Sequence, residues 1–311
     1  MINFSFYRGK EENDSTACSA VKNDQGDNSS CMANVYMFIS ITAILSITSL
    51  IGNILILIAL HKESSLHPPS KLLFRRLSCT DLLVGLISQP LFIIYLTAMA
   101  KNKQTLCLIT ERLAIISSAI VCGESITVLT AISIDRLLAL LLRSRYRQIV
   151  TLKGVRILVI SSWTTNTAFA FTLLWHKRYF FFGCCAWIGM CLAVCTFCYL
   201  KIYVALRRQQ AQVQSLQSRP GVTLNIAFYK KTVSSATWIH FTLVVCYLPY
   251  TIATVVNVSH GVSPYYGGTG SSFTGVFVFL NSTLNPFLYS WNIRQVRQTA
   301  KNTLRHWFCL S

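Results

Sequence analysis

The sequence is poor in charged residues, and acidic residues are especially scarce. Only 12% of its 311 residues are charged and just 10 are Asp or Glu, whereas 53% are hydrophobic. Soluble domains carry roughly a quarter charged residues, so this composition excludes a soluble globular protein. It indicates an all-α membrane protein, because a helix satisfies its own backbone hydrogen bonds in lipid.

The chain also lacks an apolar segment at its N-terminus of the kind that a cleaved signal peptide contains. Its first thirty residues are polar, and we expect the first membrane helix to act as an uncleaved signal. Seven apolar runs have about the 20 residues needed to cross a bilayer. They lie near Asn34–Leu60, Leu72–Met99, Leu106–Leu142, Val155–Trp175, Tyr179–Leu206, Phe228–Val258 and Ser271–Trp291. We therefore predict a tail over 1–33, a seven-helix bundle over 34–291, and an amphipathic interfacial helix with a short tail over 292–311.

The net charge of +18 is distributed unevenly between the connections. Of the 28 Lys and Arg residues, 20 lie in the connections on one side of the predicted membrane, in groups of four, six, six and four. Basic residues favour the cytoplasmic side, so we predict an extracellular N-terminus in a multi-pass plasma-membrane protein. Attraction to anionic lipid of the inner leaflet accounts for the basic excess, and nucleic-acid binding is not predicted.

Polar residues interrupt the apolar runs in a regular order. The seventh run contains Asn281-Ser-Thr-Leu-Asn285-Pro286-Phe-Leu-Tyr289, which lipid alone would disfavour. Asn53 stands in the first run and Asp81 in the second, Ser125 and Asp135-Arg136 in the third, and Pro249 in the sixth. A buried carboxylate in hydrocarbon needs partners, so these helices are expected to share a polar interior.

In this order of motifs, the chain resembles the rhodopsin-like (class A) G-protein-coupled receptors. The resemblance covers all seven helices and the segment after them. It implies a receptor that binds an extracellular small-molecule or peptide ligand, activates a heterotrimeric G protein and catalyses no reaction itself. It also implies a water-filled pocket that can hold sodium, since a hard cation prefers oxygen ligands. The residues at the matching positions are Asn53, Asp81, Ser125, Asn281, Ser282 and Asn285. A protonated Asp81 in a network without an ion is the alternative.

The resemblance also assigns the switch residues. Arg136, restrained by Asp135, is similar to the arginine that is freed on activation, and Tyr199 and Tyr289 to the tyrosines that hold the open state. Pro249 and Pro286 are expected to kink their helices. Leu137 replaces the usual Tyr of the motif. The family's acidic partner on helix six is missing from Phe228-Tyr-Lys-Lys231, which predicts raised basal activity.

The predicted ligand pocket is mixed polar and aromatic. No aspartate lies among Ser118, Ala119 and Cys122 on helix three, so an amine ligand is disfavoured. Phe279 replaces the retinal lysine of opsins. The predicted lining comprises Ser118, Cys122, Tyr247, Tyr250, Thr251, Thr254, Phe273 and Phe277. A short second outer loop and a helix five without proline resemble the melanocortin, cannabinoid, lysophospholipid and adenosine receptors, but they identify no ligand.

Several expected modifications lie near the chain ends. Asn3, Asn13 and Asn28 stand in N-x-S/T sequons and are predicted glycosylation sites. Cys309 follows the amphipathic segment and is a predicted palmitoylation site. Relative to the family, Cys107 lies one turn early and the second outer loop contains no cysteine. A disulfide from Cys107 to Cys18 or Cys31 is therefore expected.

Two further carboxyl groups each allow two interpretations, and two other protein classes are alternatives to a receptor. Glu124 is either a second switch or a neutral residue bonded locally to helix four; Glu111 is either a solvated partner of Arg112 or a contact for a cationic peptide. A small transporter or channel is the alternative to a receptor, but no internal repeat supports it. No set of paired Asp or clustered His residues suggests an intramembrane enzyme.

Overall fold

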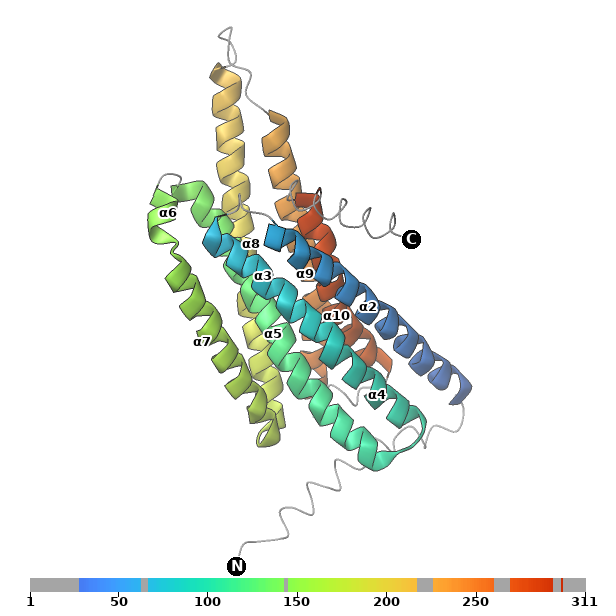
Figure 1. Ribbon diagram of the computed structural model, residues 1–311. Helices are drawn as coiled ribbons and strands as arrows, with labels where there is room; N and C mark the ends of the chain where they lie inside the picture. Colours follow the sequence, from blue (N-terminus) through green and yellow to red (C-terminus); the bar gives the residue numbers. More distant parts are fainter. Residues whose placement is uncertain are drawn as a thin grey trace, which may run out of the picture.

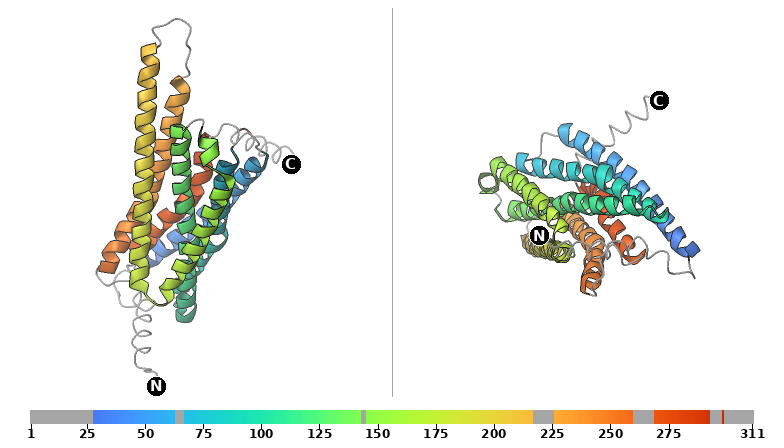
Figure 2. Two further views of the ribbon diagram at one scale, coloured as in Figure 1. Left: turned by 90° about the vertical axis from the view of Figure 1, so that its left-hand side faces the viewer. Right: turned by 90° about the horizontal axis from the view of Figure 1, so that it is seen from below.

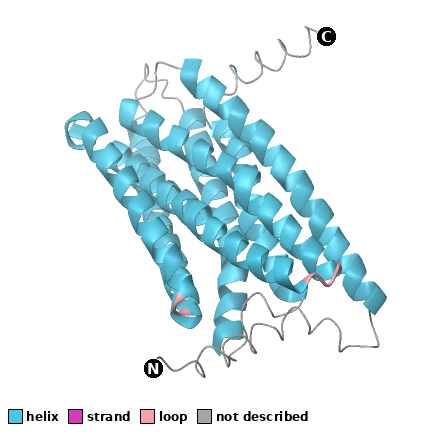
Figure 3. Cartoon of the chain, turned by 60° about the horizontal axis from the view of Figure 1, so that its bottom comes forward, coloured by secondary structure: helices cyan, strands magenta, loops and turns pink. Residues whose placement is uncertain are grey.

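The protein is a bundle of helices. The computed structural model describes residues 28–62, 67–142, 145–216, 226–259, 269–292 and 298. Within these ranges the chain consists of helices joined by short loops, with no strand (Figure 3). The prediction of an all-α fold is confirmed.

Each of the seven predicted membrane segments forms a helix or a continuous helical unit. The second consists of α3, a π-helical turn and α4 in succession, and the fourth ends in a short 3₁₀ turn. The bounds are α2 (Asn28–Lys62), α3 (Pro68–Leu83), η2 (Val84–Ser88), α4 (Gln89–Ala100), α5 (Gln104–Leu142), α7 (Leu152–Phe171), η4 (Thr172–Leu174), α8 (Lys177–Leu216), α9 (Ile226–Ser259) and α10 (Thr269–Asn292). A four-residue helix, α6 (Tyr146–Ile149), lies between α5 and α7.

Helix α5 occupies the middle of the bundle (Figure 1). It contacts α3 and α4 on one side, α8 on another, and carries α7 on its outside. Helices α2, α10, α9 and α8 contact one another in that order and close the rest of the bundle (Figure 2). Both α8 and α9 extend beyond the other helices at the end that carries α6 (Figures 1 and 2). Residues along α5 can therefore face most of the other helices.

The outer surface of the bundle is apolar. Ile44, Ile160 and Leu200 are about 60% exposed, on three different helices. Six helical segments in the described ranges are long and apolar enough to cross a membrane. The seventh helix, α10, carries Asn281 and Asn285 near its middle. An apolar exterior around polar interior residues fits a bundle surrounded by lipid.

Local sequence explains where several helices begin. Pro68 and Pro69 occupy the first turn of α3, where a missing N–H is tolerated. The Thr151 hydroxyl accepts a hydrogen bond from the Gly154 N–H at 3.2 Å and caps α7. Between α4 and α5, Asn102 adopts a left-handed conformation with φ of 51°, which asparagine tolerates better than most residues. These local signals help to set where α3, α5 and α7 begin.

The first helix differs from its prediction. It begins at Asn28, six residues before the predicted start, so the predicted tail over 1–33 includes the first turn of α2. The hydropathy pattern missed this turn because Asn28-Ser-Ser30 is polar. The predicted sites at Asn3, Asn13, Cys18 and Cys309, and the amphipathic helix after Asn292, lie outside the described residues, as do the side chains of Asn28 and Cys31.

Candidate functional site

Asp81 lies at the centre of a polar cluster in the middle of the bundle. Its side chain is fully buried. Ser125 Oγ of α5 donates to Asp81 Oδ1 at 3.0 Å, and Asn285 Nδ2 of α10 donates to Oδ2 at 2.8 Å. The Ser282 side chain is a further hydrogen-bond partner of this carboxyl group. Three helices are thus held together through a single side chain.

The other two residues of the predicted pocket behave differently from each other. Asn53 Nδ2 donates to the backbone oxygens of Ser49 at 2.9 Å and of Ser282 at 3.2 Å, so it ties α2 to α10. Asn281 is 1% exposed, yet neither polar atom of its amide has a hydrogen-bond partner among the described residues. A buried amide without a partner usually indicates a site for water or an ion. Asn281 thus contributes to the buried interior an amide oxygen that no described residue uses.

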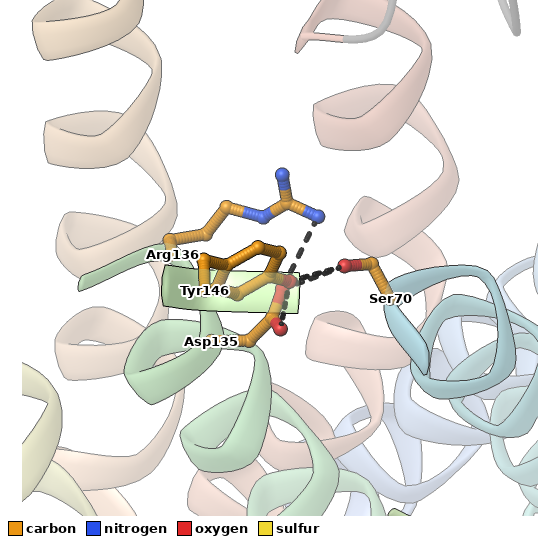
Figure 4. A network of polar contacts seen from close by, with 4 residues as sticks. All are labelled: Ser70, Asp135, Arg136 and Tyr146. Atoms are coloured by element: carbon orange, nitrogen blue, oxygen red, sulfur yellow. Dashed lines mark hydrogen bonds and ion pairs between the residues drawn. The ribbon is translucent and has the colours of Figure 1, made fainter. Parts of the chain in front are cut away.

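A second polar network surrounds Asp135 at the end of α5 that lies near α6. Asp135 is 4% exposed and accepts hydrogen bonds from Tyr146 Oη at 2.6 Å and Ser70 Oγ at 2.9 Å. Figure 4 shows these side chains converging from α5, α6 and α3. Burial and the hydrogen bond to Asp135 raise the pKa of the Tyr146 phenol, so it remains a donor at neutral pH. The network attaches the connection between α5 and α7 to the bundle.

Arg136 is bound only loosely in this network. Its guanidinium nitrogen lies 3.5 Å from Asp135 Oδ2, and 44% of its side chain is exposed. The guanidinium also lies 5.3 Å from the centroid of the Phe74 ring, a distance that allows a cation–π contact. A weak, partly exposed ion pair leaves Arg136 available to another partner.

The nearby tyrosines and prolines were also predicted to take part in switching. Tyr199 Oη lies 3.1 Å from Ser133 Oγ of α5, one turn before Arg136. Pro249 and Pro286 lie inside α9 and α10, where each removes one backbone hydrogen bond. The side chains of Tyr289 and of 228–231 are outside the described residues.

A cavity lies in the other half of the bundle, between α5, α7, α8, α9 and α10. It holds about 1050 Å³ of empty space, including the volume open to solvent at its mouth. Its walls are mainly apolar and aromatic, and none of its described lining residues is charged. Such walls with a few polar groups are typical of small-ligand sites.

Five of the eight residues predicted for this pocket line the cavity: Ser118, Cys122, Tyr247, Tyr250 and Thr254. Thr251 and Phe277 are not among its lining residues, so their contact with a ligand stays a prediction. The Thr251 hydroxyl instead donates to the backbone oxygen of Tyr247 at 2.8 Å, along its own helix. The Phe273 side chain is outside the described residues.

Sequence reasoning missed the wall that α7 and α8 contribute. Phe169 and Phe180 stack with their ring centroids 5.4 Å apart, and Asn166 lies beside them in the lining. Asn257 also lines the cavity. Its spacing from Tyr247, Tyr250 and Thr254 follows one helical face and could have revealed it. No comparable pattern pointed to Phe169 or Phe180.

Replacing Gly183 with alanine is expected to narrow the cavity. A Cβ atom at this position would lie 2.6 Å from the Cζ atom of Phe169, so the ring must move. We expect weaker ligand binding with little change in stability, because the contacting atom is the end of a side chain. Binding affinity measured for any ligand of the cavity would test this. The matched control is Gly189→Ala in the same helix, where nothing lies within 4 Å. Equal affinities for the two variants would contradict the expectation.

The predictions for Cys107 and Glu111 have different outcomes. Cys107 is disulfide-bonded, whereas the other cysteines whose side chains are described are free. The choice between Cys18 and Cys31 as its partner stays a prediction. Glu111 is 3% exposed, so the idea of a solvated carboxylate is wrong. It faces into the bundle, close enough to Tyr95 for an electrostatic interaction.

Comparisons with known proteins bear on the whole chain. The sequence matches the family described as 7 transmembrane receptor (rhodopsin family) over residues 52–179 and 170–289. It is 23% identical to melanocortin receptor 4 of Danio rerio over 93% of this chain and 90% of that protein. It is 23% identical to adenosine receptor A3 of Canis lupus familiaris, over 86% of this chain and 90% of that protein. It is 22% identical to trace amine-associated receptor 1 of Macaca mulatta, over 92% of this chain and 91% of that protein.

Proposed function

Since the chain belongs to the rhodopsin family of seven-transmembrane receptors, it is a G-protein-coupled receptor, and we propose that its cavity binds the extracellular ligand while Arg136 engages the G protein. It is a receptor rather than an enzyme, and a transporter is not favoured. One observation carries the proposal: the cavity, the Asp81 cluster and Arg136 all adjoin α5. A shift of this helix and its neighbours can therefore couple the two ends.

The same arrangement supports an orientation in the plasma membrane. The connections rich in Lys and Arg lie at the Arg136 end, which supports a cytoplasmic position for that end. The N-terminus and the cavity mouth then face outward. The basic end would contact anionic lipid as well as the G protein.

Sodium binding is a further part of the proposal. Asp81, Ser125 and the unpartnered amide of Asn281 would hold the ion, with Ser282 and Asn285 beside them. The cation would neutralise the buried carboxylate, whose described partners are all uncharged. Asn53 would support the pocket by fixing α10 against α2.

The ligand is expected to be small or to insert a small part into the cavity. The names of the relatives refer to a melanocortin, to adenosine and to trace amines, and thus agree on no ligand. The described lining contains no carboxylate for an amine. Binding therefore depends on shape and on the few polar groups in the walls.

Nucleotide exchange is the direct test of this function. The wild-type receptor should accelerate binding of a non-hydrolysable GTP analogue to at least one purified heterotrimeric G protein. Arg136→Ala should reduce this acceleration by about tenfold or more, as expected when a charge-assisted contact is lost.

The control for loss of one positive charge is Arg178→Ala, an exposed position near the start of α8 at the opposite end of the bundle. It should leave exchange unchanged. Absence of exchange with every G protein, measured for a folded wild-type receptor, would overturn the function.

A further inference from the structure

Glu124 is a buried carboxyl group that the receptor mechanism above does not use. It lies in α5 with no exposed surface. Ser162 and Asn166, one turn apart on α7, are its partners: Ser162 Oγ lies 2.7 Å from Oε1, and Asn166 Nδ2 donates to Oε2 at 2.9 Å. Ionisable groups inside a membrane protein are rare and usually functional.

These contacts fix the orientation of the Asn166 amide. Ser162 Oγ also lies 2.9 Å from the backbone oxygen of Val159, but a hydroxyl has one proton to donate. A neutral Glu124 that donates from Oε1 to Ser162 lets Ser162 donate to Val159. An ionised Glu124 accepts from Ser162 instead. In both forms Oε2 accepts from Asn166, so the Nδ2 atom is directed toward Glu124.

The same orientation leaves the Asn166 oxygen as a hydrogen-bond acceptor at the cavity. Asn166 and Gly123 both line the cavity, and Asn166 Oδ1 lies 3.4 Å from the place that a Cβ of residue 123 would occupy. No described protein group donates to this oxygen, and glycine leaves it uncovered. Two other lining atoms, Ser118 Oγ and Tyr247 Oη, are buried and have no hydrogen-bond partner in the part of the chain that the structure describes. Among its polar groups, the cavity thus presents one fixed acceptor and the two unpaired hydroxyl groups of Ser118 and Tyr247.

We propose that Glu124 is a positioning residue that turns Asn166 toward the cavity, so that the receptor selects an uncharged, largely aromatic ligand with a hydrogen-bond donor. This rests on the cavity being the ligand site. The donor would bind Asn166 Oδ1, and an acceptor on the ligand would meet Ser118 or Tyr247. A charged ligand is disfavoured, since no described lining residue carries an opposite charge. A donor-free analogue is rejected because it leaves the acceptor unpaired.

Matched pairs of fragments test this proposal. The pairs are indole with 1-methylindole and carbazole with 9-methylcarbazole, which differ by one N–H donor and one methyl group. Their apparent dissociation constants are obtained from thermal stabilisation of the purified full-length receptor. The parent compounds should bind the wild type about tenfold or more tightly than their methylated analogues. Equal binding of both members, or no binding of either parent compound, would overturn the proposal.

Variants at Glu124 separate positioning from mere packing. Glu124→Gln can donate to Ser162 and accept from Asn166, as neutral glutamic acid does, and should keep the N–H preference. Glu124→Leu should lose it. If Glu124→Leu fails to fold, the double variant Glu124→Leu with Asn166→Leu replaces both partners by apolar groups, which is better tolerated, and should also show no preference. Preference retained in either leucine variant would contradict the proposal.

The G-protein assay distinguishes a failure of the ligand assignment from a failure of the receptor function. Basal nucleotide exchange is measured on the same preparations. Normal exchange in a wild type that shows no N–H preference would contradict the ligand assignment alone. Absence of exchange would contradict the receptor function itself, whatever the fragments do.

Discussion

Replacement of Asp81 with leucine is expected to reduce the stability of the folded receptor by several kcal/mol. The Ser125 hydroxyl and the Asn285 amide would lose their acceptor in the middle of the bundle. Each buried donor left without a partner costs about 1–3 kcal/mol. Thermal unfolding in detergent, together with the amount of receptor at the cell surface, measures the loss.

Asp81→Asn is the matched control for this substitution. Asparagine keeps one acceptor oxygen at the same place, so its loss of stability should be clearly smaller. The pair also tests sodium binding, because asparagine lacks the charge that attracts the ion. When sodium replaces a large organic cation in the buffer, the melting temperature of the wild type should rise, whereas that of Asp81→Asn should not. Equal stability of the leucine and asparagine variants would contradict the central role of the carboxyl group, and an equal response to sodium would contradict the ion site.

Replacement of Gly52 with valine is expected to separate α2 from α10. A Cβ atom at Gly52 would lie 3.0 Å from Cγ and 3.1 Å from Cβ of Pro286, so even alanine fits tightly. The additional methyl groups of valine would overpack the contact, which typically costs about 1–3 kcal/mol. The proline ring cannot turn away as an aromatic ring can, so the helices themselves must move. Thermal unfolding of the variant measures the effect.

Gly189→Val provides the control for a change of helix propensity alone. Gly189 is exposed on α8 and would meet nothing within 4 Å. Its stability should stay within about 0.5 kcal/mol of the wild type, as for most surface substitutions. If the Gly52→Val receptor is as stable as Gly189→Val, the close contact between Gly52 and Pro286 does not contribute to stability, and the prediction is contradicted.

The seven helices could be predicted because lipid imposes a simple demand on sequence. A membrane helix must be apolar for about 20 residues. Each predicted range lies within an observed helix or helical unit, except that the fourth extends one residue beyond η4, to Trp175. The start of α2 was missed because its first turn is polar and has no apolar pattern. Hydropathy reports the part of a helix that contacts lipid, and α2 continues beyond it.

The Asp81 cluster was predictable because each member is polar where lipid would exclude it. Ser125 and Asn285 do bind Asp81. Asn281 could be assigned to the buried interior but not to a partner, since the angle of its side chain depends on the packing of α10. Sequence alone placed the polar groups on the right helices without fixing every bond.

The cavity was only partly predictable, because its shape depends on how α7 and α8 pack. Thr251 stands at the edge of the face formed by Tyr247, Tyr250 and Thr254, and a small rotation decides whether it lines the cavity. Phe169 and Phe180 are apolar residues in apolar helices, so nothing in their identity sets them apart. Asn166 differs: a polar residue four positions after Ser162 could have been paired with Glu124 from spacing alone.

The turn between η4 and α8 consists only of Trp175 and His176. A connection of this length cannot fold across the neighbouring cavity. It therefore imposes no slow opening step on ligand entry or exit. This connection therefore does not prolong the residence time of a ligand, which depends on the contacts between the ligand and the cavity walls. A weakly bound ligand would give a brief signal.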